Sequence, residues 1–405
     1  MRASGFVLVG LMVTSPGMGA AAQLVVDSLV VTGPALWGES PELVEELRIG
    51  PAMGSREESF GLIGGVLPLT DGSIWIGDRH LGAIQRFDST GRYLGQVGRS
   101  GQGPGEFRYP QGMRQLSDGS VAVWDDGQVR ISLFGSSGTF LRSFQPPSFM
   151  IGTPMEELEL DRETGQLMLL GGEISPDPRG KHSLFWLRLS PDGVVLDTVF
   201  VEPREPEGLV DSRATLTALS PLGYRVLGRN DSYALTLDLS PTRRRVLTRP
   251  SRPIPYQDEE RREKERLARL FSERTGLPAG RIGRTKPVFS RIQVDETGRL
   301  WLTMYSDGFA VEESEGERSR RQESCRFFGA TSSECDQGIR RWTQDTVLEV
   351  MTPEGNLYGR IALPNRESEL AAARGNLIWL IETGSLGEQY VVRYRIRAAS
   401  SAGAS

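Results

Sequence analysis

Apolar and polar residues alternate in short runs over most of the chain, in segments such as SIWIG (73–77), AIQRF (83–87) and RYLGQV (92–97). Alternation with a period of two places successive side chains on opposite faces of a β-strand. Gly, Asp and Ser cluster between these runs, at a spacing of roughly 8–12 residues that is typical of all-β domains. The pattern therefore predicts a protein built from many short antiparallel strands.

The strand pattern repeats at an offset of 47 residues, because residues 60–97 align without a gap with residues 107–144. The matched positions are Phe60 with Phe107, Asp71-Gly72-Ser73 with Asp118-Gly119-Ser120, Asp78 with Asp125, Phe87 with Phe134, and Gly91 with Gly138. Each unit divides into four strands, and the Asp-Gly pair after the first strand suits a two-residue hairpin turn. Four antiparallel strands that recur every 40–50 residues or so indicate a blade of a β-propeller.

Four fainter copies follow, and the last one, which runs from SELAAARGNLIWLIE into YVVRYRIR, lacks its fourth strand. Residues 44–60 resemble residues 94–107, where a strand leads through glycines to the phenylalanine that starts a unit. We therefore predict an all-β fold, a six-bladed β-propeller closed by an N-terminal strand. In this fold Val44–Ile49 pairs beside Tyr390–Arg397, so that no sheet edge of the ring stays exposed.

The stretch GRSGQGPGE (98–106) contains four glycines and invites comparison with a phosphate-binding loop. Such a loop needs a following helix and usually a lysine before Ser or Thr. Here the glycines lead into EFRYP, and Pro104 removes one backbone N–H donor. We interpret this stretch as the crossing from the outer strand of one blade to the inner strand of the next.

These units resemble the NHL-repeat class of six-bladed β-propellers. The resemblance rests on WIGDRHLGAIQRF (75–87), VWDDGQVRISLF (123–134) and FRYPQGM (107–113), which follow the family pattern of a strand, an Asp, a polar turn and Arg-Ile-x-x-Phe. The second unit retains Asp125, Arg130, Ile131 and Phe134, whereas the first has Ala83 at the arginine position. The clear match covers residues 60–147. The chain is also similar to exported bacterial propeller proteins, and the motif indicates the fold but no reaction.

Two insertions interrupt the blades. Residues 258–276 have Leu267, Leu270 and Phe271 on one helical face and opposite charges three or four residues apart, so they predict a helix that packs on the propeller or binds a partner. Residues 306–344 are too polar for blade strands and predict a long loop. Cys325 and Cys335, the only cysteines, lie within it, and in an exported chain they predict a local disulfide.

The chain has 405 residues and a formal net charge of −5, which gives no basic excess for nucleic acid or an anionic membrane. Residues 1–22 predict a signal peptide: Arg2 precedes an apolar core, and Ala20-Ala21-Ala22 suits cleavage. An uncleaved anchor is the alternative. We expect a lead segment (23–43), the propeller (44–398) and a disordered tail (399–405). The mature protein is expected to be periplasmic or extracellular, without a membrane span, and a monomer.

Candidate chemistry is sparse. His80 and His182 are the only histidines, so the several histidine ligands of the metal-dependent lyases of this propeller class are missing, and no metal site is predicted. Asp78 and Asp125 end equivalent strands and are expected to accept backbone N–H bonds, with a calcium contact as the alternative. The sequence contains no nucleophile-elbow, zinc-protease, Walker or EF-hand pattern.

Loop lengths indicate which face of the propeller binds. The first-to-second and third-to-fourth turns of each blade are short and share one face, which we call the short-turn face. The second-to-third loops, the inter-blade crossings, the helix and the long loop share the other, the long-loop face, and loops on a rigid scaffold are where binding concentrates. The candidate binding residues on that face are Arg79, His80, Tyr109, Asp126 and Trp342.

Our leading hypothesis is an exported binding or scaffold protein that engages a protein or a small-molecule or glycan ligand through the long-loop face. It needs no cofactor. The alternative is an esterase-like or lactonase-like propeller hydrolase with a calcium ion in the channel. A purely structural envelope component is a third possibility.

Overall fold

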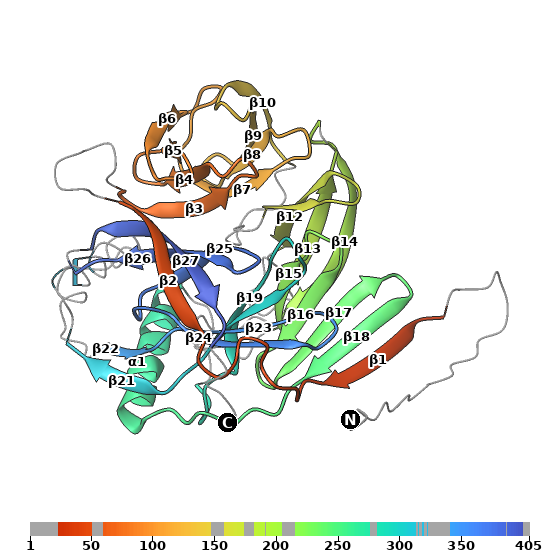
Figure 1. The fold of residues 1–405 in the computed structure, drawn as a ribbon, viewed down its shortest axis with the longest axis vertical. Coiled ribbons are helices and arrows are strands. Elements are labelled where there is room, and N and C mark those ends of the chain that lie inside the picture. The colour runs from red at the N-terminus through yellow and green to blue at the C-terminus, as the bar shows by residue number, and fades with distance from the viewer. Residues whose placement is uncertain are drawn as a thin grey trace, which may run out of the picture.

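The computed structural model describes residues 23–50, 60–146, 158–173, 182–190, 192–204, 215–275, 282–312, 315, 318–319, 322, 341–385 and 387–399. Six sheets, each with four antiparallel strands in hairpin order, surround a common centre (Figure 1). The first strand of each sheet is the innermost, and the labelled inner strands β3, β7, β15, β19 and β25 all lie toward the middle of the picture. The six-bladed β-propeller predicted from the repeat is confirmed.

The blades follow the order of the chain. Blade 1 contains β3 (Ile63–Pro68), β4 (Ile74–Asp78), β5 (Ala83–Phe87) and β6 (Tyr93–Val97), and blade 2 contains β7 (Pro110–Gln115), β8 (Val121–Asp125), β9 (Arg130–Phe134) and β10 (Phe140–Phe144). Blade 3 contains β11 (Leu158–Asp161), β12 (Gln166–Glu173), β13 (His182–Leu189) and β14 (Val195–Arg204). Blade 4 contains β15 (Thr215–Leu219), β16 (Arg225–Arg229), β17 (Ala234–Ser240) and β18 (Arg243–Thr248). Blade 5 contains β19 (Phe289–Val294), β20 (Leu300–Met304), β23 (Val347–Met351) and β24 (Leu357–Ala362), and blade 6 contains β25 (Glu369–Arg374), β26 (Leu377–Thr383), β27 (Gln389–Arg397) and β2 (Glu42–Ile49).

The ring closes as predicted. Strand β2 pairs antiparallel with β27, in a register that runs from Glu42 opposite Arg397 to Ile49 opposite Val391. The N-terminal segment thus supplies the outer strand of the blade whose other three strands come from the C-terminal end. Chain segments more than 300 residues apart complete one sheet, so the two ends of the propeller are held together by backbone hydrogen bonds.

The segment before β2 has more structure than the sequence indicated. Strand β1 (Val25–Val30) pairs parallel with β18 and adds a fifth strand to the outside of blade 4. The amides of Leu36 and Trp37 then donate to carbonyls of Leu357 and Tyr358 in blade 5, at 2.9 and 2.8 Å. Residues 23–49 therefore follow the outer edges of blades 4, 5 and 6 in turn, and we call them the N-terminal strap.

The Asp-Gly turns of blades 1 and 2 differ from the predicted two-residue hairpins. In blade 1 the amide of Leu69 donates to the carbonyl of Ser73 at 2.8 Å, and the amide of Gly72 donates back to that of Leu69 at 3.1 Å. The loop therefore holds three residues, and only Gly72 has a positive φ, of 87°. Asp71 instead accepts bonds from the backbone N–H and hydroxyl of Ser73, at 2.9 and 2.6 Å. A three-residue hairpin requires one residue in the left-handed backbone conformation, and Gly72 is that residue here.

Six groups of buried apolar side chains account for the packing of the described residues, one between each pair of neighbouring blades. The group between blades 1 and 2 contains Phe107, Trp75 and Phe134, which are at most 1% exposed. Strand alternation explains this, because each sheet turns one set of side chains toward each neighbour. The repeated phenylalanines found in the sequence are thus core residues of the blade interfaces.

The predicted helix is present as α1 (Asp258–Thr275), between blades 4 and 5. Glu260 and Ala268 are buried, at 3% and 4% exposed, whereas Leu267 of the predicted contact face is 37% exposed. The side chains of Leu270 and Phe271 lie outside the described part of the structure, so the predicted contact face stays a prediction. Within 306–344 the structure has a ribbon of β21 (Gly308–Val311) and β22 (Arg341–Gln344). Cys325, Cys335 and the signal peptide lie outside the described residues, so the disulfide-stapled loop stays a prediction. In the described part of the chain, no helix is long and apolar enough to cross a membrane.

Candidate functional site

A cavity of about 670 Å³ occupies the centre of the ring and is lined by the inner strands of all six blades. Small residues leave this space open, among them Gly64, Gly65 and Ala371–Ala373. At Gly65 a Cβ atom would lie 2.3 Å from the carbonyl oxygen of Gln111, so glycine allows β3 and β7 to approach closely. We call this cavity the channel.

Ion pairs connect the blades where the channel meets the short-turn face. Glu296, after β19, binds Arg374 of blade 6 at 2.8 Å and Arg162 of blade 3 at 3.0 Å. Arg374 also donates to the carbonyls of Pro68 and Leu69 in blade 1, at 3.0 and 3.1 Å. Burial acts to raise the pKa of Glu296, but the hydrogen bond and charge of Arg374, and then those of Arg162, outweigh it and leave the pKa below its ordinary value. The carboxylate is therefore ionised and fixed by two arginines.

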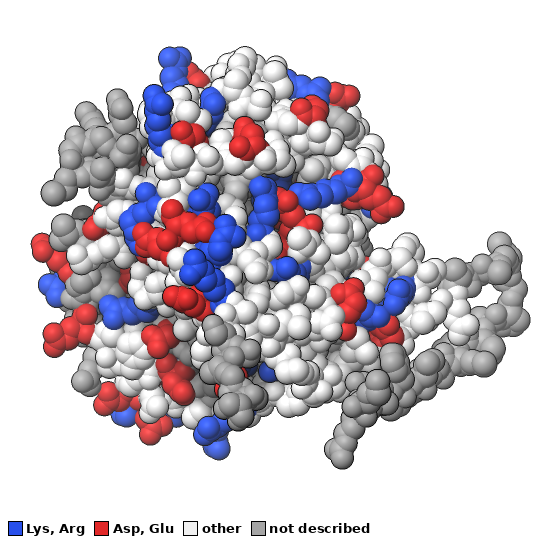
Figure 2. Space-filling model, viewed as in Figure 1, with Lys and Arg blue, Asp and Glu red and all other residues white. Residues whose placement is uncertain are grey.

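Two further pairs lie in the channel wall. Arg114 of β7 binds Glu159 of β11, with its Nε 2.9 Å from Oε2, and Arg291 of β19 pairs with Glu369 of β25. Each of these carboxylates therefore already has a cation. Figure 2 agrees with this mixture, since basic and acidic side chains lie side by side around the middle of the visible face instead of forming a patch of one sign.

Three of the five predicted binding residues come together at the long-loop end of the channel. Arg79, which follows β4, lines the channel and stacks on the ring of Tyr109, with 5.5 Å between Cζ and the ring centroid. The amide of Asp126 donates to the carbonyl of Tyr109 at 3.2 Å. Burial, as the largest cause, and the charge of Asp125 raise the pKa of Asp126, against the lowering effect of Arg79. We call Arg79, Tyr109 and Asp126 the channel-mouth cluster.

Arg79 differs from the other arginines of the channel. Its Nε is buried, and within the described residues no hydrogen bond or ion pair engages its guanidinium. Arg114, Arg162, Arg291 and Arg374 each bind a carboxylate. The long-loop end of the channel therefore carries a cation that is held by aromatic stacking and is still able to donate hydrogen bonds.

Asp78 and Asp125 hold this cluster in position. Asp78 is 1% exposed and accepts bonds from the amides of Gly61 and His80, at 2.8 and 2.9 Å. Asp125 accepts bonds from the amides of Arg108 and Tyr109, at 2.8 and 2.9 Å. Both carboxylates thus tie the loop that follows their strand to the crossing that enters the blade, as expected for structural aspartates.

The other two predicted residues lie elsewhere. His80 is exposed, and its side chain faces Gly61, where a Cβ atom would lie 2.6 Å from that of His80. Trp342 is half-buried in β22, opposite Ala310 of β21, and this ribbon lies at the lower left of Figure 1, whereas blades 1 and 2 are at the top. The structure therefore does not place Trp342 with the channel-mouth cluster.

The sequence analysis did not single out the charged residues of the channel. They are Arg114, Glu159, Arg162, Arg291, Asp295, Glu296, Glu369 and Arg374. All of them lie on inner strands or directly after them. Charged residues at those places of the predicted blades were the available signal, but the identity of each partner depends on how blades meet around the ring.

A calcium ion does not fit these carboxylates well. Calcium takes six to eight oxygen ligands, several of them from carboxylates without another cation. Glu159, Glu296 and Glu369 are each paired with arginine. Among the described residues, no group of three or more His, Cys, Asp or Glu side chains is placed to hold a metal ion.

No protein-family model matches the chain, and no curated protein matches it. Solved structures do resemble it. A member of the DUF4221 family from Bacteroides vulgatus has 12% identity and a TM-score of 0.51, with 89% of this chain and 99% of that chain covered. A protein from Bacteroides fragilis described as exported has 10% identity and a TM-score of 0.50, with 92% and 100% covered. Virginiamycin B lyase from Staphylococcus aureus has 11% identity and a TM-score of 0.38, with 84% and 82% covered. At these identities the likeness shows the propeller fold alone.

Proposed function

We propose that this protein is an exported binding protein whose ligand, a protein or a small molecule or glycan, contacts the long-loop face at the channel-mouth cluster. The observation that carries this proposal is the pairing of charges in the channel. Four arginines there bind carboxylates, whereas Arg79 is stacked on Tyr109 and forms no hydrogen bond or ion pair among the described residues, although its charge acts on Asp126. Export rests on the predicted signal peptide.

The chemistry of the cluster suits recognition. Tyrosine and arginine are the residues that most often dominate binding energy, because they combine apolar area with directed hydrogen bonds. Tyr109 is 37% exposed, so its ring is available to a ligand. Asp125 fixes the backbone at Tyr109, and this pre-organisation reduces the entropy lost on binding.

The calcium-dependent hydrolase is less well supported. It requires carboxylates that are free to bind the ion. Arginines occupy the three glutamates of the channel wall, and the carboxylate of Asp295 accepts hydrogen bonds from Thr297 and Trp301. Metal analysis of the purified protein, together with an ester and lactone assay with and without calcium, separates the two functions. A tightly held stoichiometric calcium ion with calcium-dependent hydrolysis would favour the hydrolase.

We also propose that the blades are NHL repeats. Support comes from the second unit, in which the motif residues Asp125 and Arg130 both bind the crossing between blades 1 and 2. The Cys325–Cys335 disulfide of the long loop belongs to the same proposal of an exported protein, since disulfides persist in oxidising compartments.

A ligand screen by thermal shift tests the binding function. Compounds or envelope fractions that stabilise the protein should lose most of that effect in the triple variant R79A/Y109A/D126A. The matched control is S89A/S137A on the short-turn face, which should respond as the unchanged protein does. If the control abolished the response and the triple variant kept it, the binding face would be the opposite one.

A further inference from the structure

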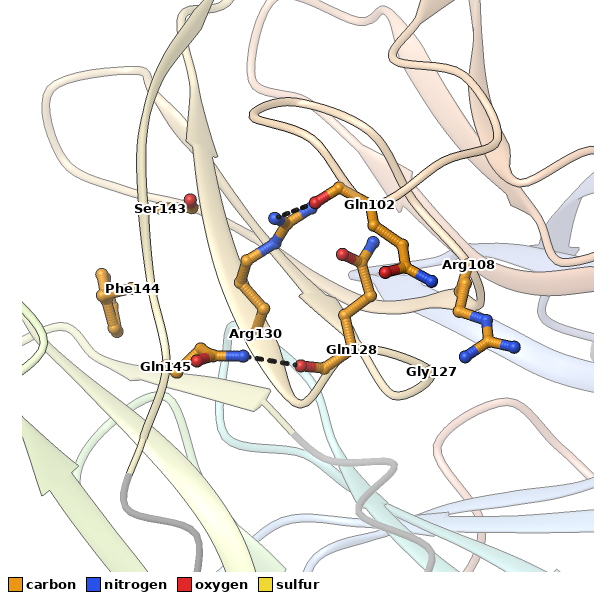
Figure 3. Close-up of a pocket in the computed structure, with 8 residues that line it drawn as sticks. All are labelled: Gln102, Arg108, Gly127, Gln128, Arg130, Ser143, Phe144 and Gln145. Carbon is orange, nitrogen blue, oxygen red and sulfur yellow. Dashed lines mark hydrogen bonds between the residues drawn. The ribbon is translucent and has the colours of Figure 1, made fainter.

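A second cavity lies in blade 2, beside the crossing that enters it. It has a volume of about 540 Å³ and is bounded by Gln102, Arg108, Gln128, Arg130 and Gln145, with Ser143 and Phe144 at one side (Figure 3). We call it the blade-2 pocket. Its volume lies in the range of small-molecule sites.

The lining of the blade-2 pocket is basic. It contains two arginines and no acidic residue. Arg108 is exposed, and in the described part of the chain no hydrogen bond or ion pair engages its guanidinium, although its backbone amide binds Asp125. An anionic group in the pocket would therefore find a cation that has no competing carboxylate in the lining.

Glutamine amides provide the remaining polar groups. Nε2 of Gln128 donates to Asp125 Oδ2 at 2.7 Å and to the carbonyls of Glu106 and Gly101 at 3.0 and 3.1 Å. These three acceptors fix its orientation, so Oε1 is the atom left for a ligand. Figure 3 shows the amides of Gln102 and Gln128 between the guanidinium groups of Arg108 and Arg130.

The walls of the pocket are held by contacts that do not involve the free groups. Arg130 donates to the carbonyls of Gln102 and Gly103, at 3.2 and 3.0 Å, and also to that of Glu106. The carboxylate of Glu106 accepts a bond from the amide of Gly103 at 2.8 Å, which closes the crossing on itself. The pocket is therefore pre-organised, a condition that favours affinity.

Backbone strain coincides with this pocket. Val129, between Gln128 and Arg130, has φ of 49° and is the only described non-glycine residue with a positive φ. A β-branched residue in the left-handed region is a true outlier, and such strain clusters at functional sites. Gln128 and Arg130, on either side of Val129, both donate to the carbonyl of Glu106 in the crossing.

We propose that the blade-2 pocket binds an acidic saccharide, with the carboxylate of a uronic acid on Arg108. A guanidinium matches a carboxylate through two parallel N–H donors. Amides that donate and accept suit sugar hydroxyls, which do the same. The side chain of Phe144 offers an apolar surface at the edge of the pocket. A simple inorganic anion would use the arginine but not the amides.

Calorimetric titration with three probes tests this assignment: a trimer of galacturonic acid, a neutral galactose trimer and inorganic phosphate. We expect the acidic trimer to bind, with an affinity that falls as salt is raised, and the neutral trimer to bind far more weakly. Equal affinity for the two trimers would overturn the role of Arg108. Binding of phosphate alone, or of no probe, would overturn the saccharide.

Variants locate the site. R108A should weaken the acidic trimer by roughly tenfold to a hundredfold, the usual range for a lost hydrogen bond to a charged group, and Q102A should weaken it less. Both side chains are exposed, so the melting temperature should not change. The control R92A removes an exposed arginine on the short-turn face and should leave the affinity unchanged. An equal loss in R92A and R108A would show a general charge effect and reject the site.

This inference and the proposed function fail separately. Arg79 lines the channel, whereas Arg108 lines the blade-2 pocket, and the two cavities share no lining residue. R79A should therefore leave uronate affinity unchanged, even where it abolishes the response at the channel mouth.

Discussion

At the scale of single residues, the motif that marks the repeat is used to hold a crossing in place. Arg130 donates to three carbonyls of residues 101–106, and Gln128 donates to two carbonyls of the same stretch. The glycines of GRSGQGPGE therefore fold into a compact loop whose carbonyls point at blade 2. The role of the crossing therefore explains the glycines of this stretch, and no phosphate ligand is needed to explain them.

Arg130→Ala should lower the free energy of unfolding by about 2 kcal/mol, because it leaves several carbonyls of the crossing without a charged donor. Urea denaturation measures the change. The matched control is Arg92→Ala in blade 1, an exposed arginine whose loss should cost less than about 0.5 kcal/mol. Equal losses in the two variants would mean that Arg130 has no special role.

Asp126 leads to a prediction about how the stability of the folded protein depends on pH. Burial raises its pKa above the ordinary value of 3.8, so the folded protein holds this proton more tightly than the unfolded chain. Asp126 therefore costs stability once the pH rises through 3.8 and beyond the raised pKa. Asp126→Asn, which is always neutral, should raise the melting temperature at pH 7, and the gain should shrink as the pH falls through the raised pKa towards 3.8.

The control for Asp126 is Asp118→Asn, for which the opposite sign is expected. The hydroxyl and then the backbone amide of Ser120 hold the pKa of Asp118 below 3.8. Its ionised form stabilises the protein at neutral pH, and this contribution is lost as the pH falls through the lowered pKa. Melting curves from pH 3 to 7 or so measure both variants. A lower melting temperature for Asp126→Asn at pH 7 would contradict the burial argument.

At the scale of elements, a buried ion pair attaches the inserted helix and ribbon to the blades. Nζ of Lys286 lies 2.9 Å from Oε1 of Glu260 in α1, and it donates to the carbonyl of Ser306 at 2.9 Å and to Gln344 of β22 at 3.1 Å. The side chains of Lys286 and Glu260 are 1% and 3% exposed. The helix and both ends of the second insertion therefore meet at the buried charge of Lys286, and the helix faces the protein with a polar residue.

Cys325 and Cys335 lie in the part of the chain that connects the two strands of the ribbon, and we predict a disulfide between them. Closing a loop of about ten residues stabilises by roughly 2–3 kcal/mol in the chain-entropy model, and little of this should reach the global fold because the loop is peripheral. Intact mass under non-reducing conditions should be lower than the reduced mass by two hydrogen atoms. Two free thiols in protein isolated from the periplasm would refute the disulfide.

At the scale of the whole molecule, the N-terminal strap connects three blades. Trp37 is 3% exposed and packs on Tyr358 and Trp301, with ring centroids 4.9 and 6.2 Å away, and its carbonyl accepts the amide of Ala399 at 2.8 Å. The strap therefore contacts residue 399, which the sequence analysis assigned to the tail. The ring is closed by β2 and reinforced by the segment before it.

Two deletions separate these contributions. Removal of residues 23–50 should expose the edge of β27 and cause aggregation or unfolding, because blade 6 loses its outer strand. Removal of residues 23–30 takes away only β1, which adds to an already complete blade, so the protein should stay monomeric with a modest loss of melting temperature. Size-exclusion chromatography and thermal melting compare them. A monomeric protein with unchanged melting after the longer deletion would disprove closure by β2.

The sequence by itself determined the number of blades, their strands and the closure, because these follow from local alternation and from a repeat that can be counted along the chain. Strand pairing within a blade joins neighbouring segments, and the missing outer strand left one available partner at the N-terminus. The sequence also located Asp78 and Asp125, since equivalent positions of a repeat share one backbone geometry.

Only the tertiary structure decided which side chains meet across blades. Arg79 and Tyr109 are 30 positions apart, and Glu296 binds arginines of blades 3 and 6, so these contacts depend on the angles between blades. The pairing of β1 with β18 could not be predicted from the sequence either. The alternation in β1 indicates a strand but does not indicate which strand it pairs with. Local pattern fixes an element and its faces, whereas a site forms where separate elements converge, and that convergence is a property of the closed ring.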